Sequence, residues 1–321
     1  MSSTEQPSKW QSQITGEWYG IPSVFNNAGQ HVGYNKVNRS SVFEDGRTTY
    51  YMDTDLQAVE PIQSRYEAQG FAFGVMDSDK DRIYMGPDFY GEGQPFGTLV
   101  DAHYYSPAWK ADLKTMVHIL PDGVTQVYSS LLYDGPRLDA VFNGMYLMAT
   151  DYDTNDDTKV RIDAFVEGEK LLGKKPHVLP MKQSGTFHGT FKTYDANQEL
   201  LGDTFVKMTY RPLNLLEAEV ELFMEGMVNQ RLRYKRTRHG NSHSYNGPDV
   251  FGNAFGYGRA LYTSYHLKGS AECIRGREFI IDANNSQSVV WQLYKSQKLE
   301  TMLYGVLKWE ESDDTLVATY D

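Results

Sequence analysis

The stretch from Tyr84 to Gly97, YMGPDFYGEGQPFG, occurs twice in this chain in related forms. The second form, YNGPDVFGNAFGYG, runs from Tyr245 to Gly258, 161 positions further on. The tyrosine, Gly-Pro-Asp, two aromatic residues and two glycines keep their places. A match of this length at a constant offset indicates an internal duplication.

Shorter matches extend the duplication in both directions. GEWYG at Gly16–Gly20 corresponds to GTFHG at Gly185–Gly189, and Tyr104 corresponds to Tyr265. Each unit has about 130 residues, which is the length of a domain and exceeds that of a solenoid repeat. The sequence therefore predicts two homologous domains, with the following parts: a flexible lead at 1–13, a first domain at 14–166, a linker at 167–184 and a second domain at 185–321.

The pattern within each unit is typical of antiparallel β-structure. Runs of five to ten residues rich in aromatic and β-branched side chains end at turn signals such as Asn26–Gly29 and Pro121–Gly123. Short strands at this spacing predict an all-β sandwich or barrel. Residues 159–166 are interpreted as a further strand of the first domain or as an edge strand that joins the two domains.

Composition excludes several classes of function. The net charge of −11 argues against a nucleic-acid partner and against an anionic membrane surface. The single cysteine, Cys273, excludes a disulfide framework and a multi-cysteine zinc site. Residues 1–12 are polar, and no run reaches the ~18 apolar residues of a membrane span, so we expect a cytoplasmic protein.

Neither a cofactor nor a metal ion is predicted. The chain has no P-loop, no Rossmann glycine pattern, no HExxH and no Gly-x-Ser-x-Gly. His239 and His243 would share a metal if they lay on a helix, but the intervening Gly-Asn-Ser favours a loop.

The first strand carries a Gly-x-aromatic-x-Gly motif around Trp18 and leads into an up-and-down meander. This combination resembles the entry motif of lipocalins and other calycins. The tandem arrangement resembles two-domain lipocalin-like proteins of uncharacterised function and double-calycin biosynthetic enzymes such as carotenoid hydratases and pericyclic cyclases. The resemblance implies two lipocalin-like barrels of eight antiparallel strands, each around a cavity for one small ligand. It places Trp18 at the barrel base against a basic residue late in the domain, and Phe187 at that place in the second unit.

Catalytic residues are expected where the two halves differ, because a duplicated fold needs its turns twice and an active site once. Asp101, His103 and Tyr105 alternate along one strand and so share one face. A carboxylate beside an imidazole suits general acid–base work, and the tyrosine adds a proton donor. The trio would line the cavity if the face with Val100 and Tyr104 lay outside; the alternative is a solvated strand face.

His118 is a fourth catalytic candidate, because it alternates with Met116 and Leu120 on an otherwise apolar face. The alternative is a hydrogen-bonded core histidine. The candidates for ligand binding are Trp18, Asp88, Tyr90, Tyr104 and Tyr133. Asp88 has an alternative role in a Gly-Pro-Asp turn, and Tyr133, which recurs as Tyr294, has a structural one.

These observations lead to two competing hypotheses of function. The first is a cofactor-independent isomerase, cyclase or hydratase that acts on a small apolar metabolite such as a terpenoid, polyene or aromatic. The second is a carrier without chemistry, and a homodimer is possible for either. A carrier would need apolar walls and hydroxyl groups, whereas an enzyme would need a histidine or carboxylate inside the barrel. A third possibility is a scaffold whose barrels are filled by side chains.

Overall fold

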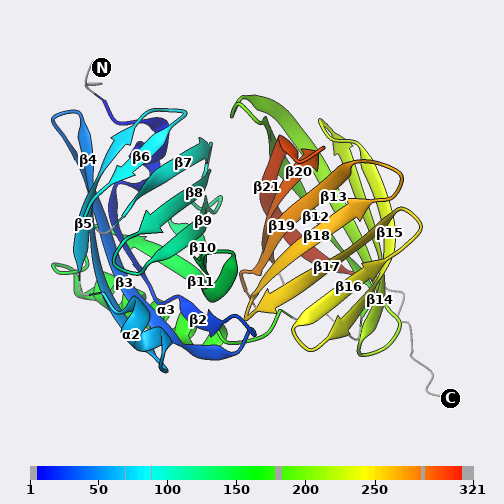
Figure 1. Cartoon of the computed structure of the whole chain (residues 1–321), viewed down its shortest axis with the longest axis horizontal. Coiled ribbons are helices and arrows are strands. Elements are labelled where there is room, and N and C mark those ends of the chain that lie inside the picture. Colours follow the sequence, from blue (N-terminus) through cyan, green and yellow to red (C-terminus); the bar gives the residue numbers. More distant parts are fainter. Residues whose placement is uncertain (1–5, 69, 88, 178–182, 283–285, 313–321) are drawn as a thin grey trace. The chain divides into compact units, whose positions relative to one another are not determined.

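The computed structural model describes residues 6–68, 70–87, 89–177, 183–282 and 286–312. The chain divides into two compact units, Met1–Lys175 and Pro176–Asp321. Each unit is built around one closed antiparallel β-barrel, as the duplication predicts (Figure 1).

The first barrel contains eleven strands, but two of them share one position. β1 and β2 are short, and each pairs with β3 on one side and with β11 on the other. The barrel therefore has ten strand positions, and the eight implied by the resemblance is wrong. The strands are β1 (Gly16–Gly20), β2 (Ser23–Asn26), β3 (His31–Glu44), β4 (Arg47–Ala58), β5 (Phe71–Asp77), β6 (Arg82–Met85), β7 (Tyr90–Phe96), β8 (Leu99–Ser106), β9 (Ala111–Ile119), β10 (Thr125–Asp134) and β11 (Arg137–Ala149).

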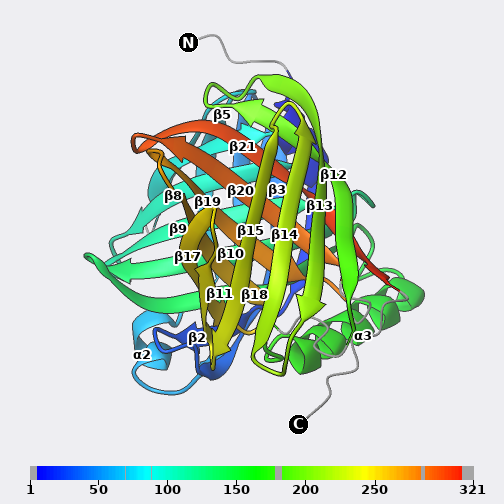
Figure 2. The same ribbon diagram turned by 90° about the vertical axis from the view of Figure 1, so that its right-hand side faces the viewer.

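The second barrel closes with ten strands in sequence order. Its first strand, β12, is continuous, whereas the first barrel has the two short strands β1 and β2 at that place. Figure 2 shows β13, β14 and β15 side by side in one wall. The strands are β12 (Gly185–Asp195), β13 (Leu200–Pro212), β14 (Glu217–Gly226), β15 (Gln230–His239), β16 (Ser242–Asn246), β17 (Val250–Tyr257), β18 (Ala260–Leu267), β19 (Glu272–Ile280), β20 (Gln287–Lys295) and β21 (Lys298–Glu311).

The strand boundaries confirm the tandem duplication. β8 and β18 begin and end 161 positions apart, and so do β9 and β19. β12 begins 169 positions after β1 and ends 169 after β2. Residues at these offsets therefore occupy equivalent places in the two barrels.

Residues 156–172 form helix α3 (Asp156–Leu172), so the strand expected at 159–166 is wrong. The Asn155 side chain caps the helix by accepting from the Asp157 and Thr158 amides, and two aspartates complement the dipole of the first turn. Ile162 and Val166 pack with residues of β1 and β11, so α3 covers the outer face of these strands. Few residues of α3 are buried, which explains the weak helical pattern in the sequence.

The expected flexible lead is also wrong for residues 9–13. Helix α1 (Lys9–Ile14) begins after Ser8, whose side chain caps it, and its Trp10 and Ile14 are buried. A third helix, α2 (Ile62–Tyr66), lies between β4 and β5. No helix among the described residues is long and apolar enough to cross a membrane.

Candidate ligand-binding site

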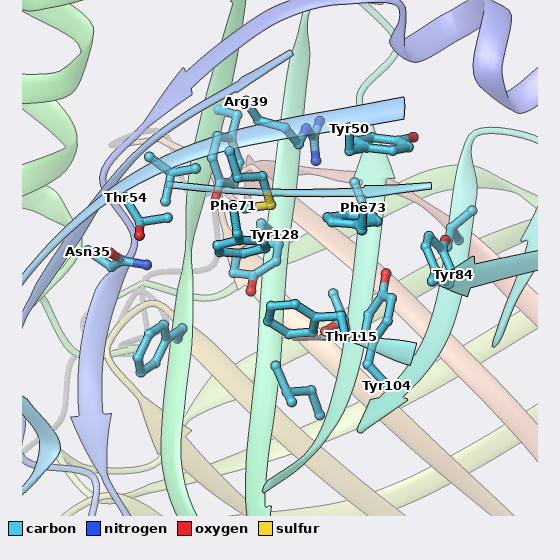
Figure 3. Close-up of a pocket in the computed structure, with 18 of the residues that line it drawn as sticks. Asn35, Arg39, Tyr50, Thr54, Phe71, Phe73, Tyr84, Tyr104, Thr115 and Tyr128 are labelled. Carbon is cyan, nitrogen blue, oxygen red and sulfur yellow. The ribbon is translucent and has the colours of Figure 1, made fainter. Parts of the chain in front are cut away.

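A cavity of about 120 Å³ lies inside the first barrel (Figure 3). Half of its 22 lining residues are aromatic, and no histidine, aspartate or glutamate lies among them. Strand alternation explains the lining, because every second side chain of a barrel strand points inward. The wall thus suits an apolar ligand that is oriented by a few polar groups.

Stacked rings form one wall of the cavity. Phe71 stacks on Phe89 with centroids 4.8 Å apart, and Phe73 stacks on Tyr50 at 5.1 Å. Phe89 also meets Trp109 edge-on at 5.3 Å. Faces and edges of rings bind planar apolar molecules well, so this wall favours a flat ligand.

Three tyrosine hydroxyls supply polar groups to the cavity. Tyr50, Tyr84 and Tyr104 all line it. Behind them lies Arg82, which donates to the Tyr50 hydroxyl at 2.9 Å and to the Tyr84 hydroxyl at 3.2 Å. Arg82 is fully buried and is neutralised by Asp77, whose Oδ1 lies 2.8 Å from Arg82 Nη1.

Burial keeps these phenols protonated. Desolvation raises the pKa of Tyr50 to about 12, even though the charge of Arg82 opposes the rise. Burial also raises the pKa of Tyr104 well above its ordinary value, and Tyr84 adds to this rise. Both phenols are therefore neutral near pH 7, and the Tyr50 hydroxyl donates to Gln11 Oε1 at 3.3 Å.

Arg39 is the lining residue that carries a permanent charge. Its guanidinium lies 5.8 Å from the Trp18 ring and 5.5 Å from the Tyr146 ring, and Nη2 donates to Gln126 Oε1 at 2.7 Å. The positive charge opposes the rise in pKa that burial causes at Tyr50, Tyr128 and Tyr146, so it acts on several lining phenols.

Helix α1 contributes Trp10 and Ile14 to the cavity wall. Its start is fixed by the Ser8 hydroxyl, which donates to Asp77 Oδ2, and by the Lys9 amide, which donates to Asp79 Oδ1 at 2.9 Å. Further along, Gln11 Nε2 donates to the Ser41 hydroxyl at 3.1 Å. These contacts hold α1 as part of the barrel interior.

The predicted catalytic trio does not line the cavity. Val100 and Tyr104 of β8 face inward, so Asp101, His103 and Tyr105 face outward. The His103 side chain is 55% exposed, with Nε2 3.4 Å from Asp112 Oδ1 on β9. The structure thus favours the alternative of a solvated strand face for these residues.

His118 is buried at 2% exposure but does not line the cavity. On β9 the inward residues are Leu113, Thr115 and Val117, so His118 lies on the opposite face. His118 is therefore a buried residue of the outer face of the barrel and does not reach the cavity.

The candidates for ligand binding divide into three groups. Tyr104 lines the cavity, and Trp18 is fully buried beside Arg39 with its indole Nε1 donating to the Ile14 carbonyl at 3.0 Å. Tyr90 is exposed on the outer face, and the Tyr133 ring lies 5.2 Å from Lys114 Nζ, outside the lining. Asp88 lies outside the described residues.

Trp18 contacts a basic residue, but its place in the chain differs from the expectation. The resemblance implies a basic residue late in the domain. Arg39 instead belongs to β3, which lies near the start of the domain. Arg39 reaches Trp18 because the two are register partners in the β1–β3 pair.

The second barrel is filled by side chains at the equivalent place. In the first barrel Thr115 and Ser130 are register partners, and their hydroxyls lie 2.8 Å apart. Gly276 and Trp291 are the equivalent pair, and the indole is fully buried. A Cβ at Gly276 would lie 2.5 Å from Trp291 Cδ1, so glycine is required there.

The second barrel also buries a carboxyl group. Glu278 stands where the first barrel has Val117, and it accepts from the Tyr265 hydroxyl at 3.2 Å. Burial raises the pKa of Glu278, while the charge of Arg236 opposes the rise. Arg236 in turn donates from Nε to His243 Nδ1 at 3.0 Å. Among the residues that the structure describes, no group of three or more His, Cys, Asp or Glu side chains is placed to hold a metal ion.

Sequence reasoning missed Arg39 and Arg82, although the same signal identifies both. At the offset of 169 Arg39 corresponds to Met208, and at 161 Arg82 corresponds to His243. The registers agree, because Arg39 pairs with Trp18 as Met208 pairs with Phe187. A comparison of every inward position between the halves would have placed these two cations among the positions that differ.

A search of protein families finds none that matches this chain, and no curated protein matches it. Among solved structures, the chain is similar to a protein of unknown function from the DUF3598 family of Nostoc punctiforme. The TM-score is 0.61 at 8% sequence identity, and the match covers 96% of this chain and 100% of the other. At this identity the similarity shows that the two proteins share the double-barrel fold.

Proposed function

We propose that the first barrel binds one small, mostly apolar molecule with a planar ring and holds it without chemical change. The observation that carries the proposal is the lining, which combines aromatic walls with protonated hydroxyls and contains no histidine or carboxylate. This composition is the one expected of a carrier. It also agrees with the ligand-binding role that the lipocalin resemblance implies.

The size of the cavity limits the ligand. Its volume of about 120 Å³ is comparable to that of an engineered apolar cavity of ~150 Å³ that binds benzene. The space therefore matches a single ring in size. Larger polyenes or terpenoids would require the lining side chains to move apart.

An isomerase, cyclase or hydratase remains a prediction from the resemblance alone. The acid–base trio that would manage protons faces outward, and the phenols inside have raised pKa values that make them weak acids. Binding is thus the function that the geometry supports best.

The proposal is tested by giving the first barrel the two residues that fill the second barrel at the equivalent place. A Thr115→Gly/Ser130→Trp variant would place an indole in the first cavity as Trp291 and Gly276 do in the second barrel. We expect 4-fluorobenzyl alcohol, followed by ¹⁹F nuclear magnetic resonance, to bind the unmodified protein saturably and to lose that binding in the variant. Circular dichroism checks that the variant is folded.

His103→Ala is the matched control, because this side chain lies outside the barrel, and it should bind the probe as the unmodified protein does. The proposal fails if the unmodified protein shows no saturable binding of the ring. It also fails if a folded Thr115→Gly/Ser130→Trp variant binds as well as the original.

A further inference from the structure

Arg39 is a charged group inside the cavity without a charged partner. Its contacts are the hydrogen bond to Gln126 and the faces of two rings, Trp18 and Tyr146. No carboxylate among the described residues forms an ion pair with it, whereas Arg82 nearby is paired with Asp77. A half-buried guanidinium is costly unless an anion or several hydrogen-bond acceptors satisfy its five N–H groups.

Gln126 supplies a second, independent observation. Its side chain is fully buried, and its Nε2 has no hydrogen-bond partner among the described residues. The guanidinium of Arg39 can only donate, so the oxygen of Gln126 must face Arg39, and the amide N–H groups point elsewhere. Gln126 lies on the same face of β10 as the lining residues Tyr128 and Leu132 but is not itself a lining residue, so it positions Arg39 from behind the cavity wall.

The second barrel shows that the fold does not require this cation. Met208 takes the place of Arg39, while Gln287 retains the place of Gln126. The guanidinium is thus present in the barrel with the cavity and absent from the barrel that Trp291 fills. Arg39 is therefore not needed for the packing that both barrels share, and this supports a role in ligand recognition.

From this arrangement we infer that the ligand carries a carboxylate, which binds to the Arg39 guanidinium that Gln126 holds in place, while its ring lies against the aromatic wall. The inference rests on the proposed binding function and names its ligand class, a small aromatic monocarboxylate. Arginine matches the planar fork of a carboxylate and forms strong charge-assisted hydrogen bonds with it.

Two probes with the same ring test the inference, 4-fluorobenzoate and 4-fluorobenzyl alcohol. We expect the unmodified protein at pH 7 to bind the benzoate about tenfold more tightly than the alcohol, as a hydrogen bond to a charged group requires. Arg39→Met, which copies Met208, should reduce the ratio of the two affinities to about one. Lys36→Met is the matched control, because Lys36 is an exposed cation on the same strand, and it should retain the preference.

The outcomes separate the two proposals. If neither probe binds the unmodified protein, the proposed function is wrong. If both probes bind the unmodified protein equally well, ring binding is supported and the carboxylate assignment is wrong. This outcome does not depend on whether any variant folds. A preference for the benzoate that persists in Arg39→Met would also overturn the assignment. Gln126→Met provides an independent variant, and it should reduce the preference without abolishing it.

Discussion

Trp18 and Arg39 are register partners across β1 and β3, and the guanidinium lies 5.8 Å from the indole ring. Phe187 and Met208 form the equivalent pair in the second barrel. Trp18 therefore has two roles. Its indole is part of the packed interior of the barrel, and it contacts the Arg39 guanidinium that faces the cavity.

This pairing predicts an energetic coupling. Trp18→Phe should destabilise the first barrel by about 1–2 kcal/mol, since it removes the indole hydrogen bond to Ile14 and weakens the contact with Arg39. In an Arg39→Met background the same change should cost about 0.5–1 kcal/mol less. Hydrogen exchange of β3 amides, read by mass spectrometry, measures all four corners of the cycle. Equal costs in both backgrounds would contradict the coupling.

The buried pair of Arg82 and Asp77 predicts a large loss of stability in Arg82→Met. The Asp77 side chain is 4% exposed, so removing its cation should cost about 3–5 kcal/mol at pH 7. Burial raises the pKa of Asp77 and the charge of Arg82 opposes this rise, so loss of the cation raises the pKa further and the folded variant holds its proton more tightly. The deficit of Arg82→Met should therefore be smaller near pH 4 than at pH 7.

The control for this pair is Arg82→Met/Asp77→Asn, which removes both charges. At pH 7 its free energy of unfolding, measured by urea denaturation, should be higher than that of Arg82→Met. This free energy should also change less with pH than it does in Arg82→Met. A double variant as unstable as the single one would show that the cost lies in packing.

His103 is predicted to be dispensable for binding. Its contact with Asp112 spans 3.4 Å between two exposed side chains, an ion pair that contributes ~1 kcal/mol or less. His103→Ala should leave the unfolding midpoint nearly unchanged and retain the affinity for 4-fluorobenzyl alcohol. Loss of that affinity in a folded variant would restore this face as a candidate site.

Two buried histidines predict that acid destabilises the second barrel. Burial and the charge of Arg236 lower the pKa of His243 to about 3, and burial lowers the pKa of His177 well below its ordinary value. A lowered folded pKa means that the unfolded chain binds the proton first. The stabilising effect of the neutral histidines is therefore fully present above the unfolded pKa of about 6.5, and the free energy of unfolding falls as the pH drops below it, by about 3 kcal/mol at pH 4.5 for His243.

His243→Gln should flatten this dependence between pH 6.5 and 4.5 as measured by urea denaturation. His188→Gln is the control, because His188 is half-exposed beside Glu310. An equal slope in His243→Gln and in the unmodified protein would exclude His243 as the source of acid lability.

The sequence predicted the barrels because their signals are local and occur twice. Alternating strands, turn residues and the repeated Tyr84–Gly97 stretch identify an antiparallel fold in two copies. Helix α3 was missed because few of its residues are buried, so its apolar stripe is narrow.

The site was harder to predict because its residues meet only after closure of the barrel. Arg39, Gln126 and Tyr146 lie on three different strands, and the direction of each side chain depends on which face becomes the interior. His103 illustrates this dependence, since inverting the faces of β8 would have placed the predicted trio inside. The cavity itself depends on single positions such as Ser130, whose equivalent is Trp291.

Trp291 acts as a built-in ligand of the second barrel. Because the indole is covalently part of the chain, it fills the interior of the second barrel whether or not a metabolite is present. Under the proposed function, the first barrel gains stability from free ligand, and above the dissociation constant this gain grows with the logarithm of the ligand concentration. Heating the protein with increasing amounts of a bound aromatic carboxylate should therefore move one unfolding transition upward and leave the other in place, so that a single chain reports the ligand against its own internal standard.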